Sequence, residues 1–241
     1  MSTRREVGPT LVACHLACMT NDGDFWEAPE RVERFAGREA DHRLTELVDE
    51  YGEPGSVRVL DQGCAGGRNT AFLADRGFDV WALDASQAMV DRTRERLADR
   101  LGAAEAGRRV VGGRMDDLAR WPDGHFDLVV ALGVHHSAAS WAEWQRAADE
   151  TARVLAAGGR LLFNQFTPAV DLTGEGVRPV DGEPHVYDGF PAGRAVLLEA
   201  DALDAEWAAR GLEPVVESET VRVELEDGTR RVSVNALYEK D

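Results

Sequence analysis

The stretch that most constrains the fold is 57–89, which reads VRVLDQGCAGGRNTAFLADRGFDVWALDASQAM. Its apolar start, 57–60, is followed by Asp61 and by a glycine-rich turn at 63–67. A helical pattern comes next, and a second apolar run ends in Asp84. Glycines let such a turn approach a ligand at dihedral angles that other residues adopt only at a cost. The stretch predicts a strand, a turn, a helix and a second strand of an open α/β sheet, which binds ligands at the carboxyl ends of its strands.

A dinucleotide is the first candidate ligand for a turn of this kind. Its G-x-G-x-x-G pattern, begun at Gly63, requires two further glycines where the chain has Ala65 and Arg68. Asp61 stands just before the turn, where its charge would repel a pyrophosphate. A carboxylate at this place suits a ligand with an ammonium group instead. A nicotinamide-dependent oxidoreductase is therefore disfavoured.

The string Asp61-x-Gly63-x-Ala65-x-Gly67, followed by Asp84, resembles motif I and the second-strand acid of class I S-adenosylmethionine (SAM) dependent methyltransferases. In that family the acid and the glycine turn meet the methionine part of SAM, and the second acid binds the ribose hydroxyls. The resemblance implies that SAM is the cofactor.

A second part of the chain carries the same resemblance. The run from Phe126 to Phe163, with its "RVL-x-x-GG" ending, matches the central segment of the family, so the resemblance covers roughly 57–166. It implies a Rossmann-like α/β fold with a seven-stranded, mostly parallel sheet of order 3-2-1-4-5-7-6, its last strand antiparallel. An Asp-Gly turn at 227–228 predicts the closing hairpin.

The resemblance also implies a set of cofactor-binding residues. They are Asp61, Gly63, Cys64, Ala65, Gly67, Arg68, Asp84, Ala85, Met89, Met115, Asp116 and Ala131. Three positions depart from the family pattern: Gln62 is polar where an aliphatic residue is common, Ala65 replaces a glycine, and Arg114 stands where an adenine-binding acid is expected. Arg68 either binds the SAM carboxylate or forms a solvent ion pair, and Met89 either packs on adenine or belongs to the core.

Methyl transfer from a sulfonium needs donor and acceptor held in line, and a base where the acceptor carries a proton. His136 and His135 follow the fourth predicted strand and are the candidate general bases; the alternative is that they only shape the loop. Trp26, His185 and Tyr187 are candidate substrate contacts, with ordinary packing as the alternative.

A length of 241 residues predicts effectively one domain. We expect an N-terminal helical or lid segment at 1–52 and a SAM-binding domain at 53–241. The Pro- and Gly-rich stretch 167–199 is longer than an ordinary connection and is interpreted as a substrate lid. Residues 1–24 are poorly patterned, with one short helix expected around 11–19.

The net charge of -17 disfavours a nucleic-acid surface and an anionic membrane as partners. The chain begins without the apolar core of a signal peptide and has no apolar run near the ~20 residues of a membrane span, so a cytoplasmic enzyme is expected. Three cysteines imply no disulfide framework. Cys14 and Cys18, one helical turn apart, lack a second half-site, so no metal is expected.

The leading hypothesis is a SAM-dependent methyltransferase, a monomer or homodimer, that methylates oxygen, nitrogen or carbon of a small molecule and releases S-adenosylhomocysteine. The first alternative is a SAM-binding enzyme that catalyses a cyclisation, decarboxylation or rearrangement, because its cofactor site would look the same. A nicotinamide oxidoreductase and a noncatalytic methyltransferase-like subunit remain as lesser alternatives.

Overall fold

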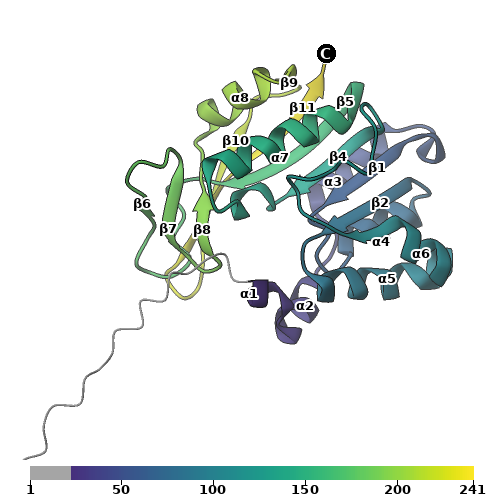
Figure 1. The fold of residues 1–241 in the computed structure, drawn as a ribbon, viewed down its shortest axis with the longest axis horizontal. Helices are drawn as coiled ribbons and strands as arrows, with labels where there is room; N and C mark the ends of the chain where they lie inside the picture. Colours follow the sequence, from purple (N-terminus) through teal and green to yellow (C-terminus); the bar gives the residue numbers. More distant parts are fainter. Residues whose placement is uncertain (1–22) are drawn as a thin grey trace, which may run out of the picture.

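The computed structural model describes residues 23–241 of the chain (Figure 1). A central sheet organises the molecule. Its strands are β1 (Arg58–Gln62), β2 (Asp79–Asp84), β3 (Val110–Gly112), β4 (Phe126–Leu132), β5 (Leu155–Phe166), β9 (Leu212–Pro214), β10 (Glu219–Glu224) and β11 (Arg230–Lys240). They lie in the order β10-β11-β5-β4-β1-β2-β3, and β9 also pairs with β11.

This order confirms the predicted topology. Strands β1 to β5 pair in parallel, and β11 runs antiparallel to β5. The one difference is that the predicted sixth strand is divided into β9 and β10, which both pair with β11. Pro214 lies opposite Tyr238 and Glu219 lies opposite Asn235, so the divided strand uses more residues than β11 over the same distance. The extra residues follow Pro214, which has no N–H for a continuous ladder.

Helices cover both faces of the sheet. They are α1 (Gly23–Glu27), α2 (Pro29–Ala36), α3 (His42–Leu47), α4 (Arg68–Asp75), α5 (Gln87–Leu101), α6 (Ala103–Arg109), α7 (Trp141–Val154) and α8 (Ala200–Ala208). In β4, Leu128 and Val130 pack in a cluster with α3 and α4, whereas Val129 and Ala131 pack in a second cluster with α7 and α8. Parallel strands buried on both faces read as continuous apolar runs, which explains why β4 was recognisable from the sequence.

The stretch 167–199 forms a small antiparallel sheet of its own. Its strands are β6 (Arg178–Pro179), β7 (Val186–Phe190) and β8 (Gly193–Val196), in the order β6-β7-β8. Val170, Ala195 and Leu197 form a separate buried cluster beneath it. The sequence predicted a long loop here, because its prolines and glycines interrupt any strand pattern.

Two expectations fall on residues that the structure does not describe. The short helix around 11–19 and the cysteines Cys14 and Cys18 lie outside 23–241. Within the described range, none of the helices has the length and apolar character needed to cross a membrane.

Candidate functional site

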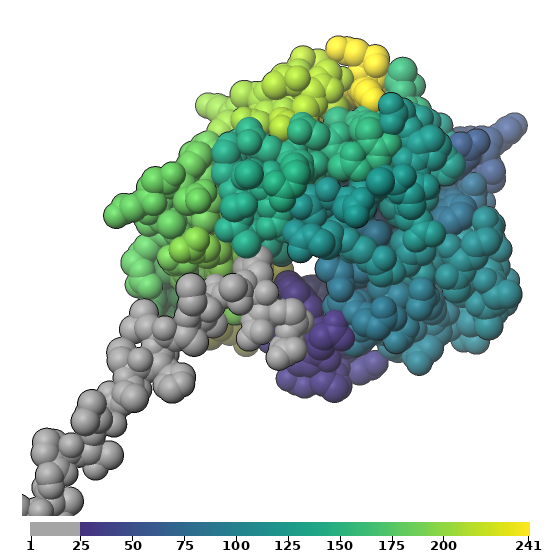
Figure 2. Space-filling view, in the orientation of Figure 1, coloured from purple at the N-terminus to yellow at the C-terminus, as the bar shows by residue number. Residues whose placement is uncertain are grey.

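A cavity of about 460 Å³ opens at the carboxyl ends of β1, β2 and β4. Figure 2 shows this face hollowed between α1–α2, in purple, and the teal surface beside them. Its size falls within the ~300–1,000 Å³ range of small-molecule sites. The predicted site residues that line it are Trp26, Gly63, Cys64, Ala65, Arg68, Asp84, Ala85, Met89 and Met115.

The glycine turn after β1 forms the floor of this cavity. Gly63 and Gly67 have φ angles of 75° and 74°, and a Cβ on Gly63 would lie 2.7 Å from the side chain of Val134. Both positions therefore require glycine. Ala65 also has a positive φ, 49°, a conformation that costs a non-glycine residue ~1–2 kcal/mol. Its N–H donates to Asp84 Oδ2 at 2.8 Å, which holds the turn in this shape.

Asp84 is fixed at the tip of β2. Its Oδ1 accepts from the N–H of Ser86 at 2.9 Å, and its Oδ2 accepts from Ala65. Burial raises the pKa of its carboxyl, the backbone hydrogen bonds oppose this shift, and the charge of Glu27 adds to it. The carboxylate still lines the cavity and retains acceptor capacity for hydroxyl groups of a ligand.

Asp61 lies behind the turn rather than on the cavity wall. It is 2% exposed, and its Oδ2 accepts from Thr70 Oγ1 at 2.6 Å. Burial raises its pKa to about 6, against the lowering effect of the Thr70 hydrogen bond. A positive ligand group above the turn would favour its ionised form. Gly67, the other predicted residue of the turn that does not line the cavity, precedes α4.

Helix α1 closes one side of the cavity. Trp26 lines it, and its ring meets that of Phe35 edge-on at 5.6 Å. The next residue, Glu27, accepts hydrogen bonds from the N–H groups of Gln87 and Ala88 at 2.9 and 3.0 Å. These N–H groups have no partner within their own helix because they belong to the first turn of α5. Glu27 thus fastens α1 to the helix that follows Asp84.

The opposite end of the cavity is apolar, with Met89, Met115 and Leu83 on its walls. Arg114, at the position of the expected acid, pairs with Glu143 at 2.7 Å and with Asp116. Glu143, from α7, lines the cavity, whereas the predicted Asp116 does not.

Two further predicted cofactor contacts, Asp116 and Ala131, do not line the cavity. Asp116 is held between Arg114 and Arg146. Ala131 is fully buried within β4. The only sequence signal for Glu143 was its place three residues after Ser140, which caps α7, and this pattern indicates a helix start and not a site.

The two histidines occupy different surroundings. His135 is fully buried, and its Nε2 lies 3.1 Å from Gln62 Oε1 and 3.4 Å from Thr151 Oγ1. Its ring packs among aromatic residues of the core, and burial lowers its pKa to about 3. This position, on the α7 side of the sheet, explains the polar residue Gln62 within β1.

His136 is 4% exposed and lies between the rings of Phe166 and Phe190, whose centroids are 4.7 and 5.3 Å away. Burial lowers its pKa to about 4, so its ring is neutral at physiological pH. Its Nδ1 is buried without a hydrogen-bond partner among the described residues. The ring lies next to Gly133, which lines the cavity.

The predicted contacts His185 and Tyr187 do not line the cavity. His185 is exposed and lies 4.8 Å from the ring of Trp141, and Tyr187 packs on the cluster beneath the small sheet. Ala192, in the turn between β7 and β8, is the residue of this segment that reaches the cavity. Sequence reasoning missed it because a buried alanine in a turn has no distinguishing pattern.

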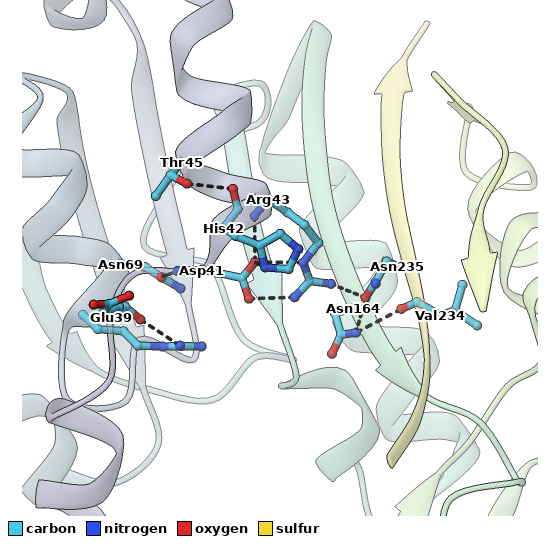
Figure 3. Close-up of polar contacts among 10 residues, drawn as sticks. Glu39, Asp41, His42, Arg43, Thr45, Asn69, Asn164, Val234 and Asn235 are labelled. Carbon is cyan, nitrogen blue, oxygen red and sulfur yellow. Dashed lines mark hydrogen bonds and ion pairs between the residues drawn. The ribbon is translucent and has the colours of Figure 1, made fainter. Parts of the chain in front are cut away.

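A polar network closes the edge of the site between α3 and the sheet (Figure 3). Arg43 forms two hydrogen bonds with the carboxylate of Asp41, at 2.8 and 2.7 Å, and a further one with Asn235 on β11. Asn235 accepts from Asn164 on β5 at 2.7 Å, and Asn69 accepts from the N–H of Asp41 at 2.9 Å. The network holds the segment before α3 against the carboxyl end of β5.

Comparison with known proteins shows which family the central part of the chain is similar to. Residues 60–163 match the model of the methyltransferase domain. Magnesium-protoporphyrin O-methyltransferase of Rhodobacter capsulatus is 40% identical over 75 residues, 31% of either chain. An uncharacterized methyltransferase of Mycobacterium tuberculosis is 32% identical over 116 residues, 48% of this chain and 42% of that protein. The chain thus spans about a third to a half of the length of these relatives.

Solved structures share the fold over nearly the whole chain. The 1,6-didemethyltoxoflavin-N1-methyltransferase of Burkholderia thailandensis, solved with 1,6-didemethyltoxoflavin and S-adenosylhomocysteine, has a TM-score of 0.66 and 21% identity, covering 98% of this chain and 94% of that one. The [4+2]-cyclase SpnF has a TM-score of 0.62 and 19% identity, covering 90% and 94%. At these identities the likeness shows a shared fold.

Proposed function

Because the chain carries a class I SAM-dependent methyltransferase domain, with SAM as its cofactor, we propose that it transfers the methyl group of SAM to a small-molecule acceptor and releases S-adenosylhomocysteine. The observation that carries this proposal is the cavity where the turn at 63–67 and the carboxylate of Asp84 meet. The residues there fit SAM: a carboxylate faces the cavity at one strand tip, and a second lies buried behind the turn. SAM supplies an activated methyl group on a sulfonium.

We assign the cofactor contacts accordingly. Asp84 accepts the ribose hydroxyls, and Asp61 stabilises the methionine ammonium through the turn. Arg68, at the start of α4, binds the methionine carboxylate. Met89 and Met115 enclose the adenine ring. In this assignment Asp61 and Asp84 are ionised, because a cation above the turn favours their carboxylate forms.

We further propose that Glu143 accepts the adenine amino group, in the role for which the sequence suggested Asp116. Glu143 lines the cavity beside Met115, and its Oε2 is fixed by the N–H of Ala139 at 3.0 Å. Asp116 is engaged by two arginines. Arg114 would then orient Glu143 from behind, which accounts for a cation where the family has an acid.

We propose that two segments cover the acceptor. Trp26 in the N-terminal segment 1–52 and Ala192 in 167–199 both line the cavity, although they are far apart in the sequence. These segments would form the lid, and the rest of 53–241 would form the cofactor-binding domain. The small sheet β6-β7-β8 would be the folded part of this lid.

We propose that His136 contacts the acceptor and that His135 positions the strand end through its bonds to Gln62 and Thr151. Full burial among core aromatics keeps His135 away from any acceptor. His136, next to the cavity residue Gly133, can accept a proton because it is neutral. A pKa of about 4 makes it a weak base, so proximity and alignment would supply most of the rate.

The acceptor is proposed to be a small molecule. The toxoflavin-precursor methyltransferase that shares the fold was solved with a small acceptor bound. The net charge of -17 opposes binding to nucleic acid.

Calorimetry with SAM, S-adenosylhomocysteine and NAD tests the proposal. We expect SAM and S-adenosylhomocysteine to bind and NAD to give no measurable heat. Asp84→Ala removes a charged acceptor and should weaken SAM binding by ~1–3 kcal/mol. Asp91→Ala, an exposed carboxylate on α5, is the matched control and should bind SAM as the unmodified protein does. Micromolar NAD binding without SAM binding would overturn the proposal.

A second candidate is a SAM-binding enzyme that transfers no methyl group. The apolar surroundings and low pKa of His136 favour it, because a cyclisation or rearrangement needs no strong base. Mass spectrometry of an acceptor screen separates the two. Methyl transfer consumes SAM and adds a methyl group to the product, whereas the alternative leaves SAM intact.

A further inference from the structure

Arg68 lines the cavity, and the guanidinium groups of Arg34 and Arg38 lie 5.6 and 4.5 Å from the ring centre of Phe35, which lines it too. With Arg231 they make up a group of four that we call the arginine cluster: Arg34, Arg38, Arg68 and Arg231. They come from the last turn of α2, the residues after it, the start of α4 and the start of β11. Partial burial lowers the pKa of Arg38, and the charges of Arg68, Arg34 and Arg231 add to this shift. Each of these three charges therefore lies within electrostatic reach of Arg38.

No carboxylate is in direct contact with the arginine cluster among the described residues, although the charge of Arg68 acts on Asp41 and Asp61. Within residues 23–241, none of its members forms an ion pair with a carboxylate. Of the neighbouring acids, Asp41 binds Arg43 and Glu33 binds Arg92, while Glu39 accepts from Arg68 through its backbone carbonyl at 3.0 Å.

Three contacts place the arginine cluster against the cavity. Arg68 lines the cavity, as does Phe35, and the guanidinium of Arg38 lies 4.5 Å from the centre of the Phe35 ring. The polar network of Figure 3 ties Arg43 of α3 to Asn235 on β11. Arg231 lies four residues before Asn235, and alternation along the strand puts both on the same face of the sheet.

The cofactor accounts for only part of this charge. The methionine end of SAM carries one carboxylate and one ammonium, and the proposed function assigns that carboxylate to Arg68. Arg34, Arg38 and Arg231 then remain without an anion. Guanidinium groups suit carboxylates and phosphates because they donate paired, parallel hydrogen bonds.

We propose that the arginine cluster binds an anionic group, a carboxylate or a phosphate, of the small molecule that accepts the methyl group. The proposal rests on the function assigned above and narrows its substrate class. In this proposal Arg38 and Arg231 hold the anion, and the remainder of the acceptor extends toward Gly133 and His136. The surplus positive charge would also attract such an acceptor against the negative net charge of the protein.

Titration of the full chain with pyrophosphate and with citrate, each with and without saturating S-adenosylhomocysteine, tests anion binding. The variants are Arg38→Gln and Arg231→Gln. Arg120→Gln is the matched control, because Arg120 is exposed, forms no ion pair among the described residues and precedes the amino end of β4, whereas the cavity lies at the carboxyl ends of the strands. We expect one anion per chain and at least a tenfold weaker affinity in the first two variants, with SAM affinity retained. Equal anion affinity in all three variants would overturn the proposal.

A paired acceptor screen then identifies the anionic group. Carboxylic acids are compared with their methyl esters, and phosphate monoesters with their parent alcohols, by release of S-adenosylhomocysteine. The charged member of the active pair should react faster, and Arg38→Gln and Arg231→Gln should remove its advantage. Faster reaction of uncharged members would contradict the proposal. Failure of SAM to bind, with anion binding intact, would instead refute the proposed function.

Discussion

Asp61 and Asp84 are carboxylates of one site with different surroundings. Asp84 faces the cavity, whereas Asp61 lies buried behind the turn with Thr70 as its hydrogen-bond donor. The pKa of Asp61 is raised to about 6, so its charge changes within the range of ordinary buffers. Its proposed role toward the SAM ammonium therefore has a pH signature.

SAM affinity should fall as the pH is lowered through about 6, because protonated Asp61 no longer attracts the ammonium. The fall should approach ~10-fold per pH unit below the pKa. Asp61→Asn should weaken binding at pH 8 and remove this pH dependence. Calorimetry from pH 5 to 8 measures both effects.

Protein stability provides the control for Asp61→Asn. The folded-state pKa of Asp61 lies above its unfolded value, so ionisation at neutral pH destabilises the free protein. The asparagine variant should thus unfold at higher urea concentration at pH 7 while binding SAM less well. An unchanged pH profile of SAM affinity would refute the role of Asp61.

His136→Ala should leave SAM affinity intact, because the ring lies beside Gly133 and away from Asp84 and Met89. If His136 accepts the acceptor's proton, the transfer rate should fall by about 10²–10⁴, and less at high pH, where the acceptor ionises unaided. Single-turnover measurements give the rate. His125→Ala, at the other end of β4, is the control. A near-normal rate would mean that His136 only shapes the loop.

At the scale of elements, α1 and the stretch 167–199 enclose the cavity, and different contacts hold each of them in place. Helix α1 is fastened to α5 by Glu27 and by Ser86 Oγ, which donates to Trp26 O at 3.3 Å. The stretch 167–199 has its own small sheet and buried cluster instead. The attachment of α1 to α5 therefore involves the carboxylate of Glu27, whereas the small sheet of 167–199 does not depend on it.

Glu27→Ala should therefore speed hydrogen exchange in 23–36 and weaken SAM binding by ~0.5–2 kcal/mol, the range for loss of a helix cap. Exchange in 167–199 should not respond to this variant. In the unmodified protein, 167–199 should gain protection when SAM and acceptor are both bound. Glu30→Ala, exposed on α2, is the control. Equal protection of 167–199 in free and bound protein would exclude its lid role.

At the scale of the whole molecule, two buried histidines couple folding to pH. The pKa values of His135 and His136 lie at about 3 and about 4, below the ordinary value of 6.5. Between pH 6.5 and 4 the unfolded chain binds these protons and the folded chain does not, so both groups lower stability as the pH falls. Asp61 acts in the opposite direction, because its folded-state pKa is raised.

Each fully titrating group contributes ~1.4 kcal/mol per pH unit. The raised pKa of Asp84 acts with that of Asp61, so the contribution of the histidines is measured by comparing variants. We expect His135 and His136 to make the free energy of unfolding fall on acidification from pH 6.5 to 4.5. His136→Leu should reduce this slope. Urea unfolding across this range measures it, and an identical slope in His136→Leu would show that His136 is not neutral in the folded protein.

The sequence alone was sufficient for the individual strands and the floor of the site, whereas the order of the sheet was implied by the family resemblance. The apolar runs at 57–60 and 126–132, and the spacing of Asp61, the glycine turn and Asp84, are local patterns. A turn that needs left-handed backbone at Gly63 and Gly67 leaves a direct trace in residue type. These features could be predicted because each depends on residues near one another in the chain.

Only the tertiary structure decided which side chains share the cavity. Glu143, Phe35 and Ala192 come from three distant segments, and their residue types are equally common in caps, cores and turns. The structure also separated the adjacent His135 and His136, because both lie in the short 3-10 helix His135–Ser137 after β4, where successive side chains point in different directions. Contacts between distant segments depend on how helices pack across the sheet, and no local pattern in the sequence records that packing.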